Sequence, residues 1–204
     1  MGRTSLKAIR QKEIIKAFYK ISKKEGLENA SIAKVAKAIA VNPSLIMHYF
    51  QTKEQLVYGL VDFILDKYLL IYKSEETTLT DPLHTLLKTI DNIFSKKWNM
   101  FFDDGVSYSI YALTFREKYV QKKFKCVLDI LRLRLEELIS LCKKEGKINI
   151  DSPAITADLI YTIADGAYYY LCVTKNKTQY EEKLTIYKQQ AIFLLNIKPL
   201  SEKL

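Results

Sequence analysis

The sequence predicts an all-α protein with about nine helices, three in an N-terminal head and the others in a C-terminal helical bundle. Only six of the 204 residues are Gly and four are Pro, and each Pro follows a cap-type residue or lies near the end of the chain. Apolar residues recur at helical spacing, whereas the alternation typical of strands is scarce. Apolar residues make up 49% of the chain, enough for a substantial core.

The first two helices are predicted from their apolar stripes. One helix is expected over about residues 5–25, with an inward stripe made of Ile14, Ala17, Phe18 and Ile21. Gly26 follows and is the residue type that most often ends a helix. A shorter helix follows, with apolar positions at i, i+3, i+4 and i+7 spacing that are Ile32, Val35, Ala36 and Ile39.

The next two helices are predicted from start signals. Asn42 can cap a helix, and Pro43 suits its first position because it gives up no hydrogen bond. This helix has room for about two turns before the capping-box pattern of Thr52 and Gln55 opens another. Two short helices joined by a tight turn form a helix-turn-helix, whose second helix can lie in the DNA major groove.

Six helices are expected from residue 53 onward. The first spans residues 53–73, and its inward residues are Leu56, Leu60, Phe63, Ile64 and Ile71. The loop 74–80 separates it from five others, which are expected over about 82–98, 106–115, 117–144, 153–173 and 179–197. We therefore predict a helix-turn-helix domain over 1–52 and a second domain over 53–204, with 53–73 as the connector.

The basic charge is concentrated in the head. The formal net charge is +9, and residues 1–60 hold 11 Lys and Arg against 4 Asp and Glu. Such an excess is expected of a surface that contacts phosphates, although a solvated basic surface gives the same count. We expect Cys126, Cys142 and Cys172 to be buried thiols in a reducing cytoplasm, because no C-x-x-C pair occurs. Neither a secretory signal nor a membrane-spanning run is visible, so we expect a cytoplasmic protein without a membrane partner.

Residues 10–58 carry a combined pattern that resembles the TetR family of transcriptional regulators. The matching residues are Ile14, Ala17, Phe18, Gly26, Ser31, Val35-Ala36, Val41, Ser44, His48-Tyr49-Phe50, Lys53-Glu54 and Leu56. The resemblance implies a three-helix DNA-binding domain followed by a helical domain that dimerises and binds a small effector. It implies a ligand-responsive regulator, most often a repressor, that binds a palindromic operator as a homodimer. Residues 157–167 also resemble the Asp-Gly segment of choline-sensing betaine regulators.

The sequence departs from the family pattern at three positions. Ala40 stands where the turn commonly has Gly, so the turn must close without the freer φ of glycine. Leu45 and Met47 replace the Thr and Tyr that often contact DNA, so neither is expected to hydrogen-bond a phosphate.

Candidate DNA contacts are divided between base reading and phosphate binding. At the start of the recognition helix, Asn42, Pro43, Ser44 and Leu45 are candidates for reading base edges, although Asn42 could be fully engaged as an N-cap. By resemblance, His48 and Tyr49 contact the DNA backbone. Lys53 begins a capped helix and is the leading phosphate contact, with Ser31 and Lys34 as further candidates.

The second domain is predicted to hold an effector pocket and a dimer interface. The pocket candidates combine aromatic and carboxylate side chains suited to a cationic or amphipathic ligand, and they are Trp98, Phe101, Phe102, Asp104, Tyr108, Tyr111, Tyr161 and Asp165. The interface candidates pair a stripe of small residues with bulky ones, and they are Ala157, Ile160, Ala164, Ala167, Leu171, Ile186, Phe193 and Leu194.

Two other functions compete with a DNA-binding regulator. An enzyme is disfavoured because the chain has two His, no Gly-rich phosphate loop and no metalloprotease or nucleophile-elbow motif, and no cofactor or metal is expected. A basic helical module that binds a protein or a membrane surface without reading DNA is the alternative. Such a module does not need the capped pair of short helices, which favours the regulator.

Overall fold

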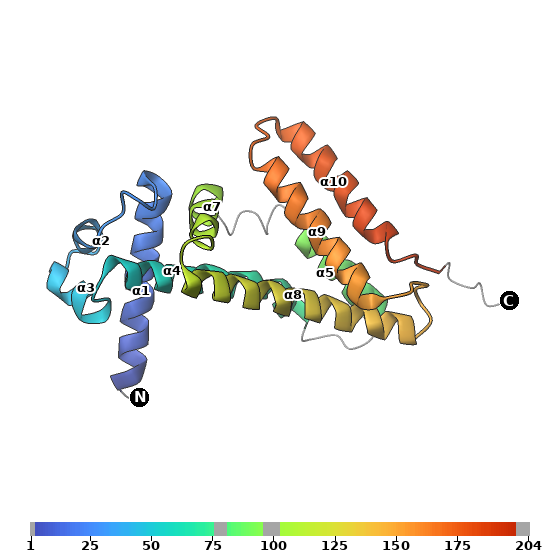
Figure 1. Ribbon diagram of the computed structural model, residues 1–204, viewed down its shortest axis with the longest axis horizontal. Coiled ribbons are helices and arrows are strands. Elements are labelled where there is room, and N and C mark those ends of the chain that lie inside the picture. The colour runs from blue at the N-terminus through green and yellow to red at the C-terminus, as the bar shows by residue number, and fades with distance from the viewer. Residues whose placement is uncertain (1–2, 76–80, 96–102, 199–204) are drawn as a thin grey trace. The chain divides into compact units, whose positions relative to one another are not determined.

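The computed structural model describes residues 3–75, 81–95 and 103–198, and these residues form nine α-helices, one 3₁₀ helix and no strand (Figure 1). The all-α class is thereby confirmed. Contacts between residues divide this part of the chain into two compact units. The first unit comprises residues 3–67 and 103–126, and the second comprises residues 68–75, 81–95 and 127–198.

Four helices form the head of the first unit, and they are α1 (Arg3–Glu25), α2 (Ile32–Ala38), α3 (Pro43–Tyr49) and α4 (Lys53–Tyr68). α2 packs against α1 and α3 packs against both (Figure 1). Their common core consists of side chains at most 1% exposed, namely Ile14, Phe18, Val35, Ala36, Ile46, Leu56 and Leu60. Gly26 ends α1 with φ +88, the left-handed conformation predicted for this position.

The first unit also contains α7 (Asp104–Leu113) and the first part of α8 (Lys118–Lys144). α7 packs on α1, and the backbone N–H of Asp103 donates to the Tyr19 hydroxyl at 3.1 Å. The Tyr58 hydroxyl donates to Glu117, and the Tyr119 hydroxyl donates to Asp62. The head therefore packs against residues far along the chain, a grouping that the sequence did not indicate.

The second unit is built from a 3₁₀ helix (Leu69–Glu75), α5 (Pro82–Ile93), the rest of α8, α9 (Pro153–Leu171) and α10 (Lys177–Phe193). α9 and α10 lie side by side in antiparallel directions, and α10 also packs on α5 (Figure 1). A buried pair of hydroxyls crosses this core, because the Tyr72 and Tyr161 oxygens lie 2.7 Å apart.

Several helix ends differ from the prediction. α4 ends at Tyr68 and continues as the 3₁₀ helix, whereas a single helix to residue 73 was expected. α5 ends at Ile93, short of the expected residue 98, and residues 96–102 lie outside the described residues. Within the described part of the chain, none of the helices is both long and apolar enough to cross a bilayer.

The cysteines only partly match the expectation of buried thiols. Cys142 is buried, and burial raises the pKa of its thiol to about 11. Cys126 is exposed and Cys172 is half-buried, so the prediction is wrong for these two. Apolar neighbours in the sequence do not decide which side of a helix a residue occupies.

Candidate DNA-binding surface

Side-chain caps define the two short helices. Ser31 precedes α2 in extended conformation, and its hydroxyl accepts from the backbone N–H of Lys34 at 3.3 Å. Asn42 precedes α3, and its side-chain oxygen accepts from the backbone N–H of Ser44 at 2.9 Å. Pro43 occupies the first turn of α3. These local bonds satisfy N–H groups that a helix start leaves unpaired. The cap predicted at Asn42 therefore forms, and Ser31 provides a further cap that was not predicted.

Ala40 closes the turn between these helices. Its φ is +53, in the left-handed region that glycine adopts without cost. The backbone N–H of Val41 donates to the carbonyl of Ala36 at 3.0 Å. The turn thus keeps the geometry that glycine favours, and the alanine bears the strain.

One side of α3 is buried and the other is exposed. Ile46 is fully buried and anchors α3 to the head. The exposed side begins with Asn42, Pro43 and Ser44 and continues with Leu45, Met47 and His48. Leu45 is 36% exposed and Met47 is 51% exposed. Exposed apolar side chains at these positions suit contact with the methyl groups of thymine better than contact with phosphate.

Asn42 is engaged as a cap. Its side-chain oxygen also accepts from the Ser44 hydroxyl at 2.9 Å. The oxygen needed for a bidentate contact with adenine is therefore occupied. Ser44 donates to the same atom, so without exchanging this bond Asn42 can offer a base edge only its amide donors and Ser44 only its acceptor lone pairs.

His48 and Tyr49 differ in their surroundings. Their rings meet edge to face with centroids 5.2 Å apart. His48 is exposed, whereas Tyr49 is half-buried and lines a groove of about 580 Å³ beside α1 and α4. Phe50 lines the same groove and is 7% exposed, as expected of a core residue.

Both candidate lysines have partners within the protein. The Lys53 ammonium donates to the backbone carbonyl of Glu28 at 2.7 Å, which joins α4 to the loop after α1. The Lys34 ammonium pairs with the Glu25 carboxylate at 2.6 Å and donates to the carbonyl of Asn29. This hydrogen bond from Lys34 holds the pKa of Glu25 below its usual value. An ammonium has three donors, so each lysine can still offer one to a phosphate.

The start of α4 is capped as the sequence indicated, with one difference. The Thr52 hydroxyl accepts from the backbone N–H of Gln55 at 3.3 Å. The Gln55 side chain accepts from Gln51, one residue earlier than the standard reciprocal bond. Bonds from its own backbone N–H and from the Thr52 hydroxyl lower the pKa of Glu54. The Glu54 carboxylate therefore already lies at the N-terminus of α4 beside Lys53, where it competes with a phosphate for the positive end of the helix dipole.

The predicted effector residues do not form one cluster within a unit. Trp98, Phe101 and Phe102 lie outside the described residues. Asp104, Tyr108 and Tyr111 belong to the first unit, and Tyr161 and Asp165 belong to the second. Asp103, next to Asp104, caps α7 by accepting from the backbone N–H of Val106.

Arg132 occupies the aromatic and acidic surroundings that we expected a cationic ligand to use. Its guanidinium lies 5.3 Å from the Tyr161 ring centre and pairs with Asp165 at 3.2 Å and Asp158 at 2.8 Å. Tyr161 is 4% exposed, and burial raises its pKa well above the usual value. Tyr161 is thus closed to an effector, whereas Asp165 is exposed but already paired with an internal cation.

The small-residue stripe of α9 faces the protein interior. Its five members are between 0% and 4% exposed, and they are Ala157, Ile160, Ala164, Ala167 and Leu171. They are therefore unavailable to a second protomer, which corrects the predicted interface. On α10, Ile186 is 51% exposed and Phe193 is 79% exposed, while Leu194 is half-buried.

The opposite face of α9 carries a second apolar stripe that the sequence analysis missed. Its members Ile155, Leu159 and Tyr169 are between 44% and 72% exposed, and Val173, in the turn after α9, is 74% exposed. They repeat at multiples of the helical period, which was the available signal. Gly166 lies on this face with open space where a side chain would stand. The small-residue stripe on the other face was predicted as the interface instead.

Two family models match the sequence. The model described as bacterial regulatory proteins, tetR family, matches residues 14–58, which include α2, α3 and the start of α4. The model described as tetracyclin repressor-like, C-terminal domain, matches residues 81–197. Among curated proteins, the nucleoid occlusion factor SlmA of Actinobacillus pleuropneumoniae is 23% identical over 208 residues, covering 99% of this chain and 96% of the relative. SlmA of Haemophilus influenzae is 23% identical over 171 residues, covering 80% and 75%.

Solved structures share the fold. A TetR transcription regulator from Haloarcula marismortui superposes with a TM-score of 0.79 at 20% identity, over 92% of this chain and 97% of that one. A transcriptional regulator from Saccharomonospora viridis, solved in complex with choline, superposes with a TM-score of 0.77 at 11% identity, over 94% and 100%. At these identities the likeness concerns the fold alone.

Proposed function

This chain belongs to the TetR family of DNA-binding transcriptional regulators, and on that premise we propose that it is a cytoplasmic repressor without catalytic activity. It binds a palindromic operator as a homodimer and leaves it when a small-molecule effector binds. The DNA-binding part of this proposal rests on the exposed side of α3. The buried Ile46 anchors this capped helix, which follows a tight turn, and leaves its other side open to DNA.

The DNA contacts are proposed in two groups. Leu45 and Pro43 touch base methyl groups, and Ser44 and Asn42 read base edges after exchanging their mutual bond. His48, Tyr49, Lys53, Lys34 and Ser31 contact the backbone, where most of the affinity arises. The exposure of His48 supports its role, whereas the half-buried position of Tyr49 leaves mainly the edge of its ring for DNA.

The dimer is proposed to form through the exposed faces of α9 and α10. Ile155, Leu159 and Tyr169 on α9 adjoin α10, which exposes Ile186 and Phe193. Val173, in the turn between the two helices, is exposed as well. Exposed apolar stripes on two antiparallel helices suit an isologous four-helix interface. The two heads are then expected to reach half-sites roughly 34–36 Å apart, or a multiple of that spacing.

The effector is proposed to act by shifting a population. α4 and α8 are continuous helices whose residues belong to both units. A ligand that prefers one arrangement of these helices changes DNA affinity through a coupling of typically ~1–3 kcal/mol. We retain a small effector of cationic or amphipathic type as a proposal, with Asp104, Tyr108 and Tyr111 as its remaining described candidates.

The test is selection of operator sequences from random DNA, followed by fluorescence anisotropy with the selected duplex. A palindrome bound with a specificity ratio of at least about a thousand over scrambled DNA is the expected result. Salt-dependent binding without any sequence preference would contradict the proposal. Isothermal titration with quaternary ammonium compounds then tests the effector class, and the absence of heat with all of them would count against a cationic effector.

A further inference from the structure

The segment that joins α7 to α8 exposes aromatic side chains that the proposed DNA contacts do not use. Phe115 is 77% exposed, Tyr111 is 47% exposed and Tyr119 is 37% exposed. The rings of Tyr111 and Phe115 meet edge to face with centroids 5.7 Å apart, so they form one continuous surface. Exposing aromatic area of this kind to water costs free energy. This free energy is recovered when a less polar phase covers the rings.

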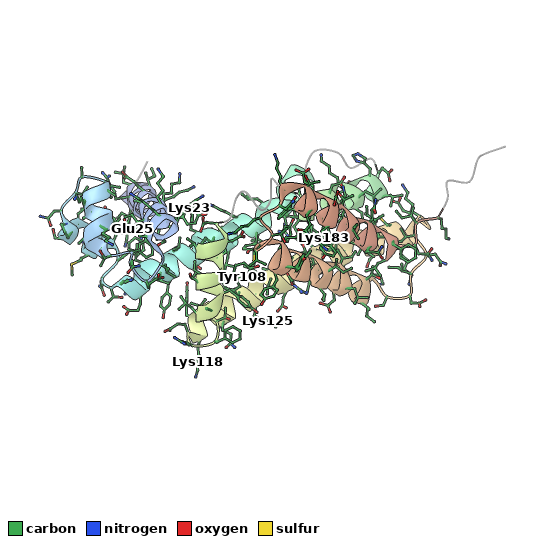
Figure 2. All side chains as sticks on the ribbon, turned by 90° about the horizontal axis from the view of Figure 1, so that it is seen from above. Lys23, Glu25, Tyr108, Lys118, Lys125 and Lys183 are labelled. Carbon is green, nitrogen blue, oxygen red and sulfur yellow. The ribbon has the colours of Figure 1, made fainter. Side chains whose placement is uncertain are left out.

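The same segment is strongly basic. Residues 111–125 hold five basic residues and a single acidic one. Arg116, Lys118 and Lys122 are exposed and form no ion pair with any residue that the structure describes. Figure 2 shows Lys118 pointing outward from the turn. The one acidic residue, Glu117, accepts a hydrogen bond from Tyr58 and forms no ion pair with these three cations, so the segment keeps a positive net charge.

This surface is distinct from the recognition helix. Within the first unit, α7 has its main contacts with α1. Both views place α2 and α3 on one side of α1 and α7 on the other (Figures 1 and 2). A duplex held by α3 is therefore not the natural partner of this segment. The partner of this segment must accept protruding aromatic rings and, beside them, several cations.

We propose that residues 111–125, the aromatic–basic turn, form a docking surface for an anionic lipid bilayer. Tyrosine and phenylalanine rings enter the interfacial layer of a bilayer, and lysine and arginine beside them meet the phosphate headgroups. Each such cation near an anionic surface strengthens binding roughly fivefold. Peripheral attachment of this kind needs no spanning helix, so it replaces our expectation of no membrane partner.

Vesicle co-sedimentation tests the proposal. The wild-type protein is expected to bind phosphatidylcholine vesicles containing about one-third phosphatidylglycerol, and to be released when salt rises from about 0.05 to about 0.5 M. Vesicles of phosphatidylcholine alone are expected to bind far less. Neutralising the three cations together, as Arg116→Gln, Lys118→Gln and Lys122→Gln, should weaken binding roughly a hundredfold. Phe115→Ser should weaken it about tenfold while leaving the salt dependence unchanged.

A matched control removes the same charge elsewhere. Lys144, Lys175 and Lys177 are exposed and make no ion pair with described residues, and their joint replacement by Gln should leave vesicle binding unchanged. Circular dichroism checks that every variant is folded. Operator affinity, measured in parallel, should be the same in the Arg116, Lys118 and Lys122 variant as in the wild type.

Three outcomes would overturn the proposal. The first is a wild-type protein that does not bind anionic vesicles at low salt. The second is equal vesicle binding by the Arg116, Lys118 and Lys122 variant and the control variant. If that variant instead loses operator affinity with a salt slope lower by about three units, the turn contacts DNA phosphates and not lipid. Each of these three results leaves the proposal of a repressor unaffected, because operator selection tests that proposal separately.

Discussion

Ala40 closes the turn between α2 and α3 in a conformation that costs an alanine ~1–2 kcal/mol. Glycine avoids this cost but loses about 0.4–1 kcal/mol more chain entropy on folding. We therefore expect Ala40→Gly to stabilise the protein by roughly 0.5–1 kcal/mol, measured by urea unfolding followed at the helical circular dichroism signal. Ala38→Gly is the matched control. Ala38 lies in α2, so this substitution should lower the free energy of unfolding by about 1 kcal/mol. Destabilisation by both substitutions would contradict this account.

Lys53 is expected to bind phosphate in addition to holding the carbonyl of Glu28. Lys53→Met keeps the apolar stem and removes the ammonium. Operator affinity should fall for all DNA sequences alike, and the slope of log affinity against log salt should decrease by about one unit. Lys20→Met, at an exposed position of α1, is the control. A stability loss with an unchanged salt slope would assign Lys53 a structural role alone.

The caps of the helices were predictable because their bonds are local. Asn42, Asp81 and Ser152 each accept from a backbone N–H two or three residues later, and each precedes a Pro that favours a helix start. The helix-turn-helix followed from these caps and the apolar spacing. The engagement of Asn42 by Ser44 was also foreseeable as one of two alternatives, since the cap uses the same oxygen as a base contact.

Contacts between distant segments were not predictable in the same way. Arg132 on α8 forms ion pairs with Asp158 and Asp165 on α9, and no spacing in the sequence predicts these ion pairs. α9 is apolar on two faces, so the sequence could not show which face the interior would take. The structure buries the face that carries the alanines together with Ile160 and Leu171, because small side chains allow closer packing inside the unit.

Asp81 provides a pH-dependent contribution at the start of α5. Its carboxylate caps the helix at Leu83 and accepts a short hydrogen bond from the Lys147 ammonium. This bond lowers the pKa of Asp81 below its usual value. A lowered pKa stabilises the folded protein above the unfolded pKa of about 3.9, and the contribution is lost as the pH falls through the folded value.

We therefore expect Asp81→Asn to lower the urea midpoint at pH 7, and the difference from the wild type to shrink as the pH falls below about 3.9. Asparagine retains an oxygen that caps α5, so the difference isolates the bond to Lys147. Urea titrations at several pH values between 3 and 7 provide the measurement. Asp91→Asn, which loses an exposed contact with Lys188, serves as the comparison. A difference between Asp81→Asn and the wild type that persists undiminished at pH 3 would show that the cap, and not the ionised pair, is responsible.

The whole molecule requires a second copy for the function that we propose. A seven-residue recognition helix reads few base pairs, so useful specificity needs two heads on one palindrome. Within one protomer, the apolar area that remains uncovered on α9, α10 and the turn between them includes Tyr169 at 72%, Phe193 at 79% and Val173 at 74% exposed. Covering these side chains in a dimer recovers free energy that the monomer does not gain.

Phe193→Glu should convert the dimer to a monomer, because it places a charge in the proposed apolar interface at a side chain that is 79% exposed in the protomer. Sedimentation velocity at micromolar concentration measures the mass, and operator anisotropy should show a loss of about a hundredfold or more in affinity for the palindrome. Phe115→Glu is the matched control, since Phe115 is 77% exposed and lies in the other unit. It should remain dimeric. A Phe193→Glu protein that stays dimeric would exclude this face as the interface, and a wild-type monomer would remove the basis for a palindromic operator.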